Sequence, residues 1–438
     1  MTLRILHVLS SPHLGGAEQM CLRLAEAQLT AGQEVALHVF ERGKVTDAAQ
    51  VAGIPTIRSP GLCEPTSLSR RERWRIFAEQ FQNTLEEFQP DLVHSHVPLT
   101  HLVCHRVAPR IPVPWVATIH GSWKQFAYAP QTHRRPYLRP YLLLRHAIGD
   151  FLVTRSAARI VAVSDSVQRD LERVGIHRRR IVRIHNGLAE VPNLVDKESG
   201  RARFRIAADS IVLGSLGFMA PVKGFDLLIR AAGSLTPRYP RLCLLIAGGD
   251  VLGQESVRRT LQKLVKKLNL QEHVQLLDAL DPAEGFFSAL DIYVVSSRTE
   301  GTPLSLIEAM QYGKPSVVTS AGGCVEAARP ELEGLVFRSG DVRSLAGAIE
   351  RLIMDGSLRE SLGHAARERA AGYLTLSRCA GEYENLYSSV LDCPSPYRSG
   401  KPPISRTESR DSKCAAVTSR EVRSSDPGDI PARMPLPE

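Results

Sequence analysis

The chain has 438 residues, of which 43% are hydrophobic and 23% charged, and this composition is ordinary for a soluble globular protein with two or three domains. Its eight cysteines are dispersed without a C-x-x-C pair and no apolar run approaches bilayer-spanning length, which argues against a zinc site, a disulfide framework and a membrane span, and predicts a cytoplasmic protein. The net charge of +9 favours nucleic acid, an anionic membrane surface or phosphorylated substrates, but the basic residues are scattered without aromatic stacking platforms, so we expect no nucleic-acid partner.

Strand-like apolar runs alternate with helical patterns from the start of the chain. The first run, from Leu3 to Leu9, is too short for the core of a signal peptide and is interpreted as a buried strand. The expected strands of this first series are 3–10, 34–40, 91–94, 114–119 and 159–163, and the helical patterns between them include 17–31, 70–88 and 137–155.

A second alternating series follows a polar, irregular break at residues 186–203. Its expected strands are 211–217, 242–247, 273–277, 291–295, 316–319 and 334–337, and helices are expected near 341–354, 358–371 and 375–391. Strands that alternate with helices form parallel sheets, so we predict an α/β protein with two Rossmann-like domains and a ligand cleft between them.

The predicted organisation has five parts. From residue 393 the composition shifts to Pro, Ser, Arg and Asp, which cannot bury enough apolar surface to form a core. We therefore expect an N-terminal domain at 1–185, a hinge at 186–203, a C-terminal domain at 204–374, a final helix at 375–392 and a disordered tail at 393–438.

The stretch from Ser297 to Pro315 is the most informative part of the sequence. Thr302 suits the N-cap of a helix and Pro303 its first position, while Gly313 suits the C-terminal end. Glu300 then precedes a helix N-terminus, where amides and the dipole favour a phosphate. Glu308 lies two turns into an apolar helix and requires a partner. The spacing of the two glutamates is weak evidence alone; the capped helix strengthens it.

Three further residues or pairs follow predicted strands and each has a plainer alternative. Gly15-Gly16 allows close approach of a phosphate or is simply a tight turn. His120 follows an apolar strand and is either a cleft donor, acceptor or acid/base group or a structural histidine. Lys223 opens another helix and either holds a diphosphate or is a solvated loop lysine.

Taken together in chain order, these motifs resemble those of the group 1, or family 4, glycosyltransferases, which are retaining enzymes of the two-domain GT-B fold that use nucleotide sugars. The phrase from Glu300 to Met310 is especially similar to enzymes of bacterial surface-polysaccharide assembly. The resemblance covers roughly residues 3–391 and rests on Gly15-Gly16, His120, Val163-Ser164, Asn186-Gly187, Lys223-Gly224, Glu300 with Glu308, and Gly322-Gly323 with Glu326.

The resemblance implies roles for these residues. Lys223 would clamp the donor diphosphate, Glu300 would hold donor-sugar hydroxyls, and Glu308 would bind the ribose. His120 would contact the transferred sugar, and the final helix would return to the N-terminal domain. The implied catalytic groups are His120, Lys223 and Glu300, and the implied donor site comprises Gly15, Gly16, Asn186, Lys223, Glu300, Gly301, Thr302, Pro303, Leu304 and Glu308.

Two positions depart from the family pattern. Phe218 stands where the family usually places an arginine, five residues before the lysine, so a bidentate donor to the leaving phosphates is missing there. The loop usually read as Gly-x-Gly-Pro is Gly248-Gly249-Asp250-Val251. Both departures bear on donor identity and on catalytic rate.

The expected co-substrate is a nucleotide sugar, with a UDP-sugar favoured over a GDP-sugar, and no metal or other cofactor is expected because Lys223 and helix amides can stabilise the leaving diphosphate. The expected acceptor is a glycan or a lipid-linked molecule. Basic, aromatic and leucine residues at 132–146 suit peripheral contact with an anionic membrane on its inner face, although an amphipathic helix packed on the sheet is the favoured interpretation.

Two alternatives to an active transferase are kept open. One is a catalytically weak GT-B scaffold or subunit that lacks the clamp arginine at 218. The other, more distant, is a nucleotide-sugar epimerase with a similar two-domain fold. The presence of Glu300, Glu308, Lys223 and His120 favours the transferase.

Overall fold

The structure is a computed structural model, and its described residues are 2–10, 13–59, 69–107, 113–128, 154–191, 195–250, 256–280 and 283–392, with four single residues between 140 and 151. Most of the helical pattern predicted at 137–155, the basic and aromatic region at 132–146 and the tail predicted at 393–438 lie outside the described residues.

The first sheet has seven parallel strands in the described part of the chain, in the order β3-β2-β1-β4-β5-β6-β7. The order in which strands are added reverses at β1, because β2 pairs with one edge of β1 and β4 pairs with the other. Such a switch point is where parallel sheets bind ligands. The strands are β1 (Arg4–Leu9), β2 (Glu34–Val39), β3 (Thr56–Arg58), β4 (Leu92–Ser95), β5 (Trp115–Ile119), β6 (Arg159–Ala162) and β7 (Ile181–Arg183).

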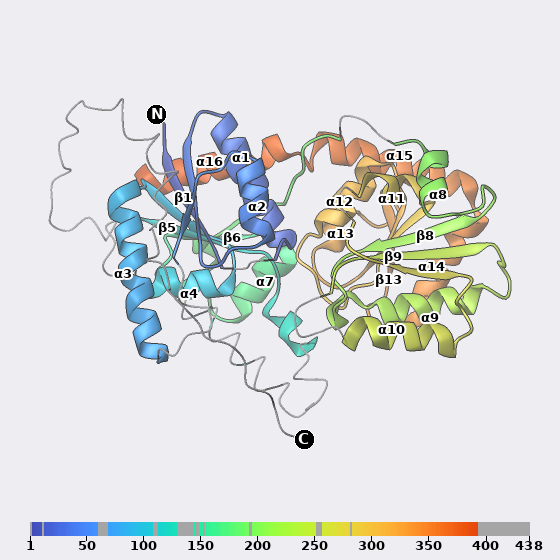
Figure 1. The fold of residues 1–438 in the computed structure, drawn as a ribbon. Coiled ribbons are helices and arrows are strands. Elements are labelled where there is room, and N and C mark those ends of the chain that lie inside the picture. The colour runs from blue at the N-terminus through green and yellow to red at the C-terminus, as the bar shows by residue number, and fades with distance from the viewer. Residues whose placement is uncertain are drawn as a thin grey trace, which may run out of the picture. The chain divides into compact units, whose positions relative to one another are not determined.

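Helices cover both faces of this sheet (Figure 1). Buried side chains of α1 and α2 pack with one set of strand residues, including Ile5, and those of α3, α4 and α7 pack with the other set, including Leu6. The helices are α1 (Gly16–Thr30), α2 (Lys44–Val51), α3 (Arg70–Phe88), α4 (Pro98–Val107) and α7 (Asp165–Arg173), with short 3₁₀ segments η2 (Trp123–Tyr128) and η4 (Arg178–Arg180).

The second sheet has six parallel strands in the described residues, in the order β10-β9-β8-β11-β12-β13. These strands are β8 (Ile211–Leu216), β9 (Leu242–Ala247), β10 (Val274–Leu277), β11 (Ile292–Val295), β12 (Ser316–Thr319) and β13 (Gly334–Phe337). Near-continuous burial of strands such as β9 fits a sheet that is covered on both faces.

Two groups of helices cover the second sheet (Figure 1). One group shares a core with Leu213, and the other packs on the opposite face around Tyr293. The first group is α9 (Phe225–Leu235), α10 (Ser256–Lys267) and α14 (Val342–Met354), and the second is α8 (Lys197–Arg203), α11 (Glu284–Ala289), α12 (Leu304–Gln311), α13 (Cys324–Ala327) and α15 (Gly356–Gly372); the 3₁₀ turn η5 (Pro221–Lys223) precedes α9. The predicted α/β architecture of two parallel-sheet domains is confirmed.

The chain crosses between the two sheets twice, and the two crossings are paired. Leu188 N donates to Leu374 O at 2.9 Å, and Leu376 N donates to Leu188 O at 2.8 Å. A Cβ on Gly187 would lie 2.0 Å from Thr375 O, so only glycine permits this approach. The two linkers therefore form one short ladder.

The last helix, α16 (Leu376–Asp392), lies beside α1 and hydrogen-bonds to the N-terminal sheet (Figure 1). The hydroxyl of Tyr387 lies 2.6 Å from His94 Nδ1, and the hydroxyl of Tyr383 lies 3.1 Å from Thr118 Oγ1. Both tyrosines are almost fully buried. The C-terminal end of the described chain therefore contributes to the core of the N-terminal domain.

Three elements differ from the sequence expectation. Strands β3 and β7 were not expected, since each has only three residues and lies at an edge of the sheet, where the apolar signal is weak. Helix α8 occupies part of the segment expected to be an irregular hinge. Asp196 caps it by accepting from Ser199 N at 2.8 Å, and Arg201 pairs with Asp291 at 2.7 Å, so its charged composition concealed a packed helix.

Candidate active site in the cleft between the sheets

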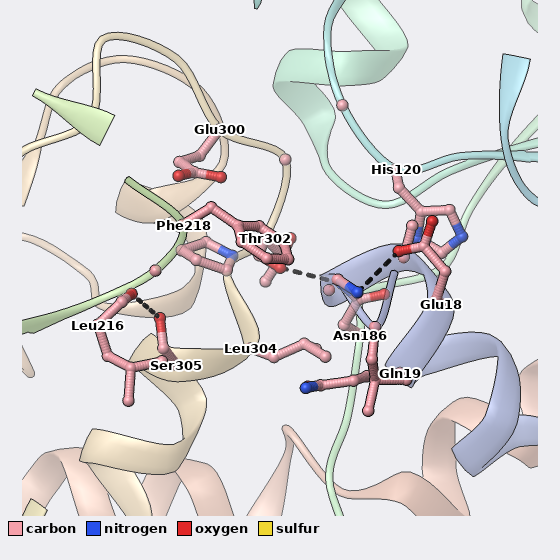
Figure 2. Close-up of a pocket in the computed structure, with 18 of the residues that line it drawn as sticks. Glu18, Gln19, His120, Asn186, Leu216, Phe218, Glu300, Thr302, Leu304 and Ser305 are labelled. Carbon is pink, nitrogen blue, oxygen red and sulfur yellow. Dashed lines mark hydrogen bonds between the residues drawn. The ribbon is translucent and has the colours of Figure 1, made fainter. Parts of the chain in front are cut away.

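A cleft of about 730 Å³ lies between the carboxyl ends of the two sets of strands. Figure 2 shows Glu300, Phe218 and Ser305 on one side of it and Glu18, Gln19 and His120 on the other. All of the predicted catalytic and donor-site residues line this cleft: Gly15, Gly16, His120, Asn186, Lys223, Glu300, Gly301, Thr302, Pro303, Leu304 and Glu308. Their individual roles remain predictions.

Gly15 and Gly16 lie at the start of α1 and line the cleft on the side of the N-terminal domain. Gly15 is the N-cap residue, and its amide donates to Glu18 Oε2 at 3.1 Å. A Cβ on Gly15 would lie 2.7 Å from that carboxylate and 3.1 Å from the Phe218 ring, whereas a Cβ on Gly16 would meet nothing within 4 Å. Gly15 thus permits close packing of the two domains, and Gly16 faces open space at a helix N-terminus, where an anion is favoured.

Lys223 and Glu300 meet across two loops of the C-terminal domain. Lys223 Nζ donates to Glu300 Oε1 at 2.5 Å, and Ser297 Oγ donates to the same oxygen at 2.7 Å. Gly224 lets the loops approach, because its φ is +65° and a Cβ there would lie 2.2 Å from Ser296 O. The ammonium and carboxylate therefore form a preassembled ion pair in the lining of the cleft.

Helix α12 begins one residue later than predicted. Pro303 is its N-cap residue and Leu304 its first helical residue, so the assignment of Thr302 as N-cap was wrong. The Thr302 hydroxyl instead donates to Val163 O at 2.8 Å, and Asn186 Nδ2 donates to Thr302 O at 3.0 Å. Contacts with the other domain and the linker outweigh the local capping preference of threonine.

Glu308 finds the partner that its position requires on the other domain. Arg23, on α1, lies 3.2 Å from Glu308 Oε1 through its NH2 atom, while the NH1 atom of Arg23 is buried and has no hydrogen-bond partner among the described residues. Sequence reasoning missed Arg23. The signal available was a lone guanidinium in the apolar stretch between Met20 and Ala25 of a helix that opens with the glycine pair.

Phe218 lines the cleft at the position where the family usually has an arginine. Among the described lining residues, no arginine of the C-terminal domain replaces that missing side chain. The lysine and arginine side chains among the described cleft residues are Lys223 and Arg23. Arg298 is close in sequence to Glu300 but is held by Asp226 through contacts of 2.9 and 2.8 Å and by Pro221 O. The positive charge available to a leaving diphosphate within the described lining thus comes from Lys223 and Arg23.

His120 sits at the end of β5 and contacts a group of buried imidazoles. Its Nε2 lies 3.3 Å from His96 Nδ1, and His96 also lines the cleft. Desolvation by the surrounding protein lowers the pKa of His120 to about 4. Desolvation, and to a smaller extent repulsion from neighbouring imidazoles, lowers the pKa of His96 well below the ordinary value. Both rings are neutral near pH 7.

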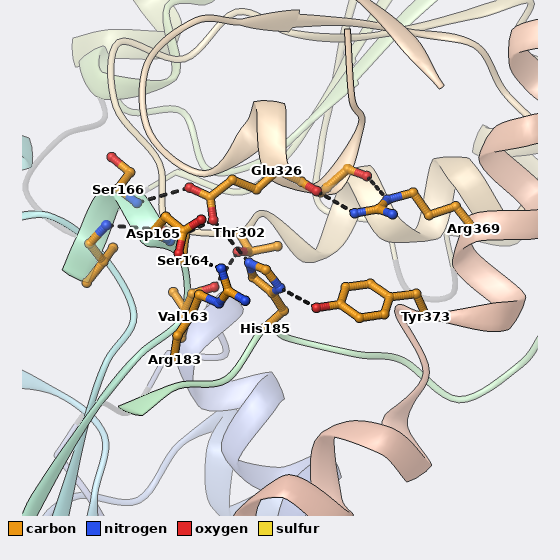
Figure 3. Close-up of polar contacts among 12 residues, drawn as sticks. Val163, Ser164, Asp165, Ser166, Arg183, His185, Thr302, Glu326, Arg369 and Tyr373 are labelled. Carbon is orange, nitrogen blue, oxygen red and sulfur yellow. Dashed lines mark hydrogen bonds and ion pairs between the residues drawn. The ribbon is translucent and has the colours of Figure 1, made fainter. Parts of the chain in front are cut away.

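A second interdomain contact lies beside the cleft. Figure 3 shows Glu326, from the short helix α13 that follows the glycine-rich loop, reaching the N-terminus of α7 and His185. Its carboxylate accepts from Asp165 N at 2.6 Å and from Ser166 N at 3.0 Å, and His185 Nε2 lies 3.0 Å away. The glutamate of one domain therefore caps a helix of the other.

Replacing Glu326 with alanine should loosen this contact, because two amides at the start of α7 lose a charged acceptor. The expected loss is about 1–2 kcal/mol, as for other cap residues, and the measurement is the urea midpoint of unfolding. Glu331→Ala serves as the control, since the side chain of Glu331 forms an exposed ion pair with Arg351 and has no other polar contact among the described residues. An equal shift in both variants would show that the contact with α7 contributes nothing.

One group of described side chains has a possible metal-binding arrangement. The ligand atoms of His7, Cys21 and His96 lie within 4.8 Å of one another, and all three residues are buried. His7 Nδ1 and His96 Nε2 are 2.9 Å apart, which is an ordinary hydrogen-bond distance.

None of the described helices combines the length and the apolarity needed to cross a bilayer. Two family models match the chain: "Glycosyl transferases group 1" over residues 196–369 and "Glycosyltransferase Family 4" over residues 14–189.

Similar proteins include a D-inositol 3-phosphate glycosyltransferase of Kineococcus radiotolerans, 30% identical over 65% of this chain and 68% of its own. A protein of the same name from Mycobacteroides abscessus is 29% identical over 92% of this chain and 90% of its own. HepE of Anabaena, solved with UDP and glucose, has a TM-score of 0.76 at 21% identity over 88% of this chain and 100% of its own, which shows a shared fold. The two-sheet fold, the matched models and these relatives place the chain among the group 1 glycosyltransferases.

Proposed function

We propose that the protein transfers a sugar from a nucleotide-sugar donor to a hydroxyl group of an acceptor, with retention of anomeric configuration. The observation that carries the proposal is the Lys223–Glu300 ion pair beside the N-terminus of α12, directly in the cleft lining. A cation, a carboxylate and a helix N-terminus together match what a departing diphosphate and a sugar ring require.

The donor diphosphate would lie against Lys223 and the backbone amides of the loop from Gly301 to Leu304. A lysine ammonium has three donors, so Lys223 can contact a phosphate while it keeps its bond to Glu300. Glu300 Oε2 has no hydrogen-bond partner among the described residues, and it is the oxygen that would accept from a donor-sugar hydroxyl.

The donor ribose would compete with Arg23 for Glu308. Because Arg23 and Glu308 already share one contact of 3.2 Å, ribose hydroxyls would displace or rearrange the guanidinium. Arg23 would then be free to face phosphate charge, which partly offsets the arginine that is absent at 218. One donor-binding cation would then lie on each domain.

The donor base is proposed to be uracil, on the example of HepE, whose structure holds UDP and glucose. For the acceptor we propose a glycan or lipid-linked molecule of the cell surface, which would bring the enzyme to the inner face of the membrane. The names of the relatives add a phosphorylated polyol as a second acceptor class. The two classes are separated by assaying each with the same donor.

Thermal-shift measurements with UDP-glucose, GDP-glucose and ADP-glucose test the donor proposal. A ligand at 100 times its dissociation constant stabilises the folded state by about 2.7 kcal/mol, so a selective donor should raise the unfolding temperature clearly. We expect the UDP-sugar to give the largest shift. No shift with any of the three would contradict nucleotide-sugar binding.

A catalytically weak scaffold is the alternative, and the observation that favours it is Phe218 in the cleft wall. The two functions differ in a simple measurement. An enzyme releases nucleoside diphosphate in the presence of an acceptor, whereas a scaffold shows a donor-induced thermal shift without turnover.

Transfer is expected to proceed without a divalent metal, because Lys223 and helix amides would stabilise the leaving group. Initial rates in excess EDTA should stay within about twofold of the untreated enzyme, a change too small to reflect loss of a transition-state contact. Magnesium and manganese added back to the treated enzyme serve as the control. Activity that vanishes with EDTA and returns with manganese would contradict this scheme.

A further inference from the structure

A chain of hydrogen bonds runs from His120 at the cleft into the interior of the N-terminal domain. His120 Nε2 lies 3.3 Å from His96 Nδ1, and His96 Nε2 lies 2.9 Å from His7 Nδ1. His7 Nε2 then lies 2.7 Å from Oε1 of Gln28 on α1. His7, His96 and Gln28 are at most 2% exposed, so water does not compete for these contacts.

Each imidazole in this chain is neutral and carries a single N–H. Desolvation lowers the pKa of His7 and that of His120 to about 4. Desolvation and the neighbouring imidazoles keep the pKa of His96 well below its ordinary value. A neutral ring donates from one nitrogen and accepts at the other. Fixing the direction of one bond therefore fixes the direction of all the others.

Gln28 sets that direction. Its carbonyl oxygen faces His7, and its amide nitrogen faces the hydroxyl of Tyr387 on α16 at 3.4 Å. A carbonyl oxygen only accepts, so His7 donates from Nε2 and accepts at Nδ1. His96 must then donate from Nε2 and accept at Nδ1. His120 is left to donate from Nε2.

The consequence appears at the cleft. With its proton on Nε2 and directed inward, His120 carries a lone pair on Nδ1, and Nδ1 has no hydrogen-bond partner among the described residues. We propose that Gln28, His7 and His96 are positioning residues that hold His120 in the Nε2–H tautomer, so that Nδ1 accepts a hydrogen bond from a hydroxyl of the bound sugar or acceptor. Only this last step rests on the proposed transferase function.

The competing occupant of the chain is a metal ion between His7, Cys21 and His96. Two nitrogens on one tetrahedral zinc lie roughly 3.3 Å apart, given a Zn–N bond of about 2.0 Å. The nitrogens of His7 and His96 are 2.9 Å apart, which suits a shared proton better. A metal would also take the lone pairs of both nitrogens, so His96 would donate from Nδ1 and His120 would be forced into the opposite tautomer.

Nitrogen-15 NMR of histidine-labelled protein tests the tautomer without any substrate, so it gives a result even if the proposed function is wrong. His120→Asn identifies the His120 signals. We expect an unprotonated Nδ1 in the wild-type protein, and metal analysis should find no stoichiometric zinc. A protonated Nδ1, with or without bound zinc, would overturn the assignment.

Gln28→Leu tests the positioning role from a residue outside the cleft lining. Without the carbonyl acceptor, His7 Nε2–H is unsatisfied, so the chain should reverse and His120 should become the Nδ1–H tautomer. Turnover should fall about tenfold, the effect of losing one hydrogen bond, with little change in the donor KM. Gln50→Leu is the matched control, because Gln50 is exposed on α2.

The outcomes separate the steps of the proposal. An unchanged His120 tautomer in folded Gln28→Leu protein would overturn the positioning role. A reversed tautomer with wild-type turnover would overturn the role of Nδ1 as an acceptor. Circular dichroism of the variant establishes that it is folded, and the wild-type NMR result stands independently of it.

Discussion

Replacing Lys223 with alanine is expected to lower turnover by at least about 10²–10³-fold, the usual cost of removing one preorganised donor to developing charge. Lys223 is one of two lysine or arginine side chains among the described cleft residues, and the family arginine five positions earlier is Phe218. Its loss leaves Glu300 bonded to Ser297 alone, without a compensating cation. Steady-state rates over a range of donor concentrations give the measurement.

The control for this change is Lys263→Ala, which removes an equal charge from the exposed face of α10. Phe218→Arg is the complementary variant and should either raise turnover or unfold the loop. The second outcome would follow from a clash with Gly15, because a Cβ built on that glycine would already lie 3.1 Å from the Phe218 ring. A Lys223→Ala enzyme of near-normal rate would show that the leaving group relies on another cation, with Arg23 the first to examine.

Gly301→Ala is expected to abolish most activity while each domain stays folded. A Cβ at this position would lie 2.2 Å from His120 O and 2.9 Å from Val163 Cγ2, both in the N-terminal domain. The added methyl therefore obstructs the approach of the two domains rather than either core. Misplacement of reacting groups by about 1 Å costs on the order of 10²-fold, so turnover should fall at least that far.

Two comparisons make this prediction decisive. Donor affinity should fall much less than turnover, since Lys223, Glu300 and Glu308 all belong to the C-terminal domain. Gly347→Ala, on α14, introduces the same methyl where nothing lies within 4 Å and should leave turnover unchanged. Wild-type turnover in the Gly301→Ala enzyme would mean that the loop yields and that this contact is dispensable.

The sequence was sufficient for the elements and for most of the cleft. Strands such as β9 and helices such as α1 follow from apolar periodicity, because a residue's burial against its own sheet leaves a local pattern. Alternation of these elements makes the sheets parallel, and parallel sheets gather strand ends at one edge. That is why His120, Lys223 and Glu300, each following a strand, could be expected in one cleft.

Tertiary structure decided the contacts between the two domains. Arg23 meets Glu308 across 285 positions, Glu326 caps α7, and Thr302 donates to Val163 instead of capping α12. Each contact depends on the relative placement of loops from separate sheets, and no local pattern encodes that placement. Local capping preference, worth about 1 kcal/mol, gives way to such contacts.

The sequence also could not predict which ring nitrogen of His120 carries the proton. It identified the residue but left its role open between acid, base, donor and acceptor. Its tautomer follows from Gln28 through His7 and His96, residues brought together from α1, β1 and the end of β4. A sequence determines which groups can hydrogen-bond. The direction of each hydrogen bond depends on the whole series of partners, because a neutral imidazole donates from one nitrogen and accepts at the other. Only the folded structure brings these partners together.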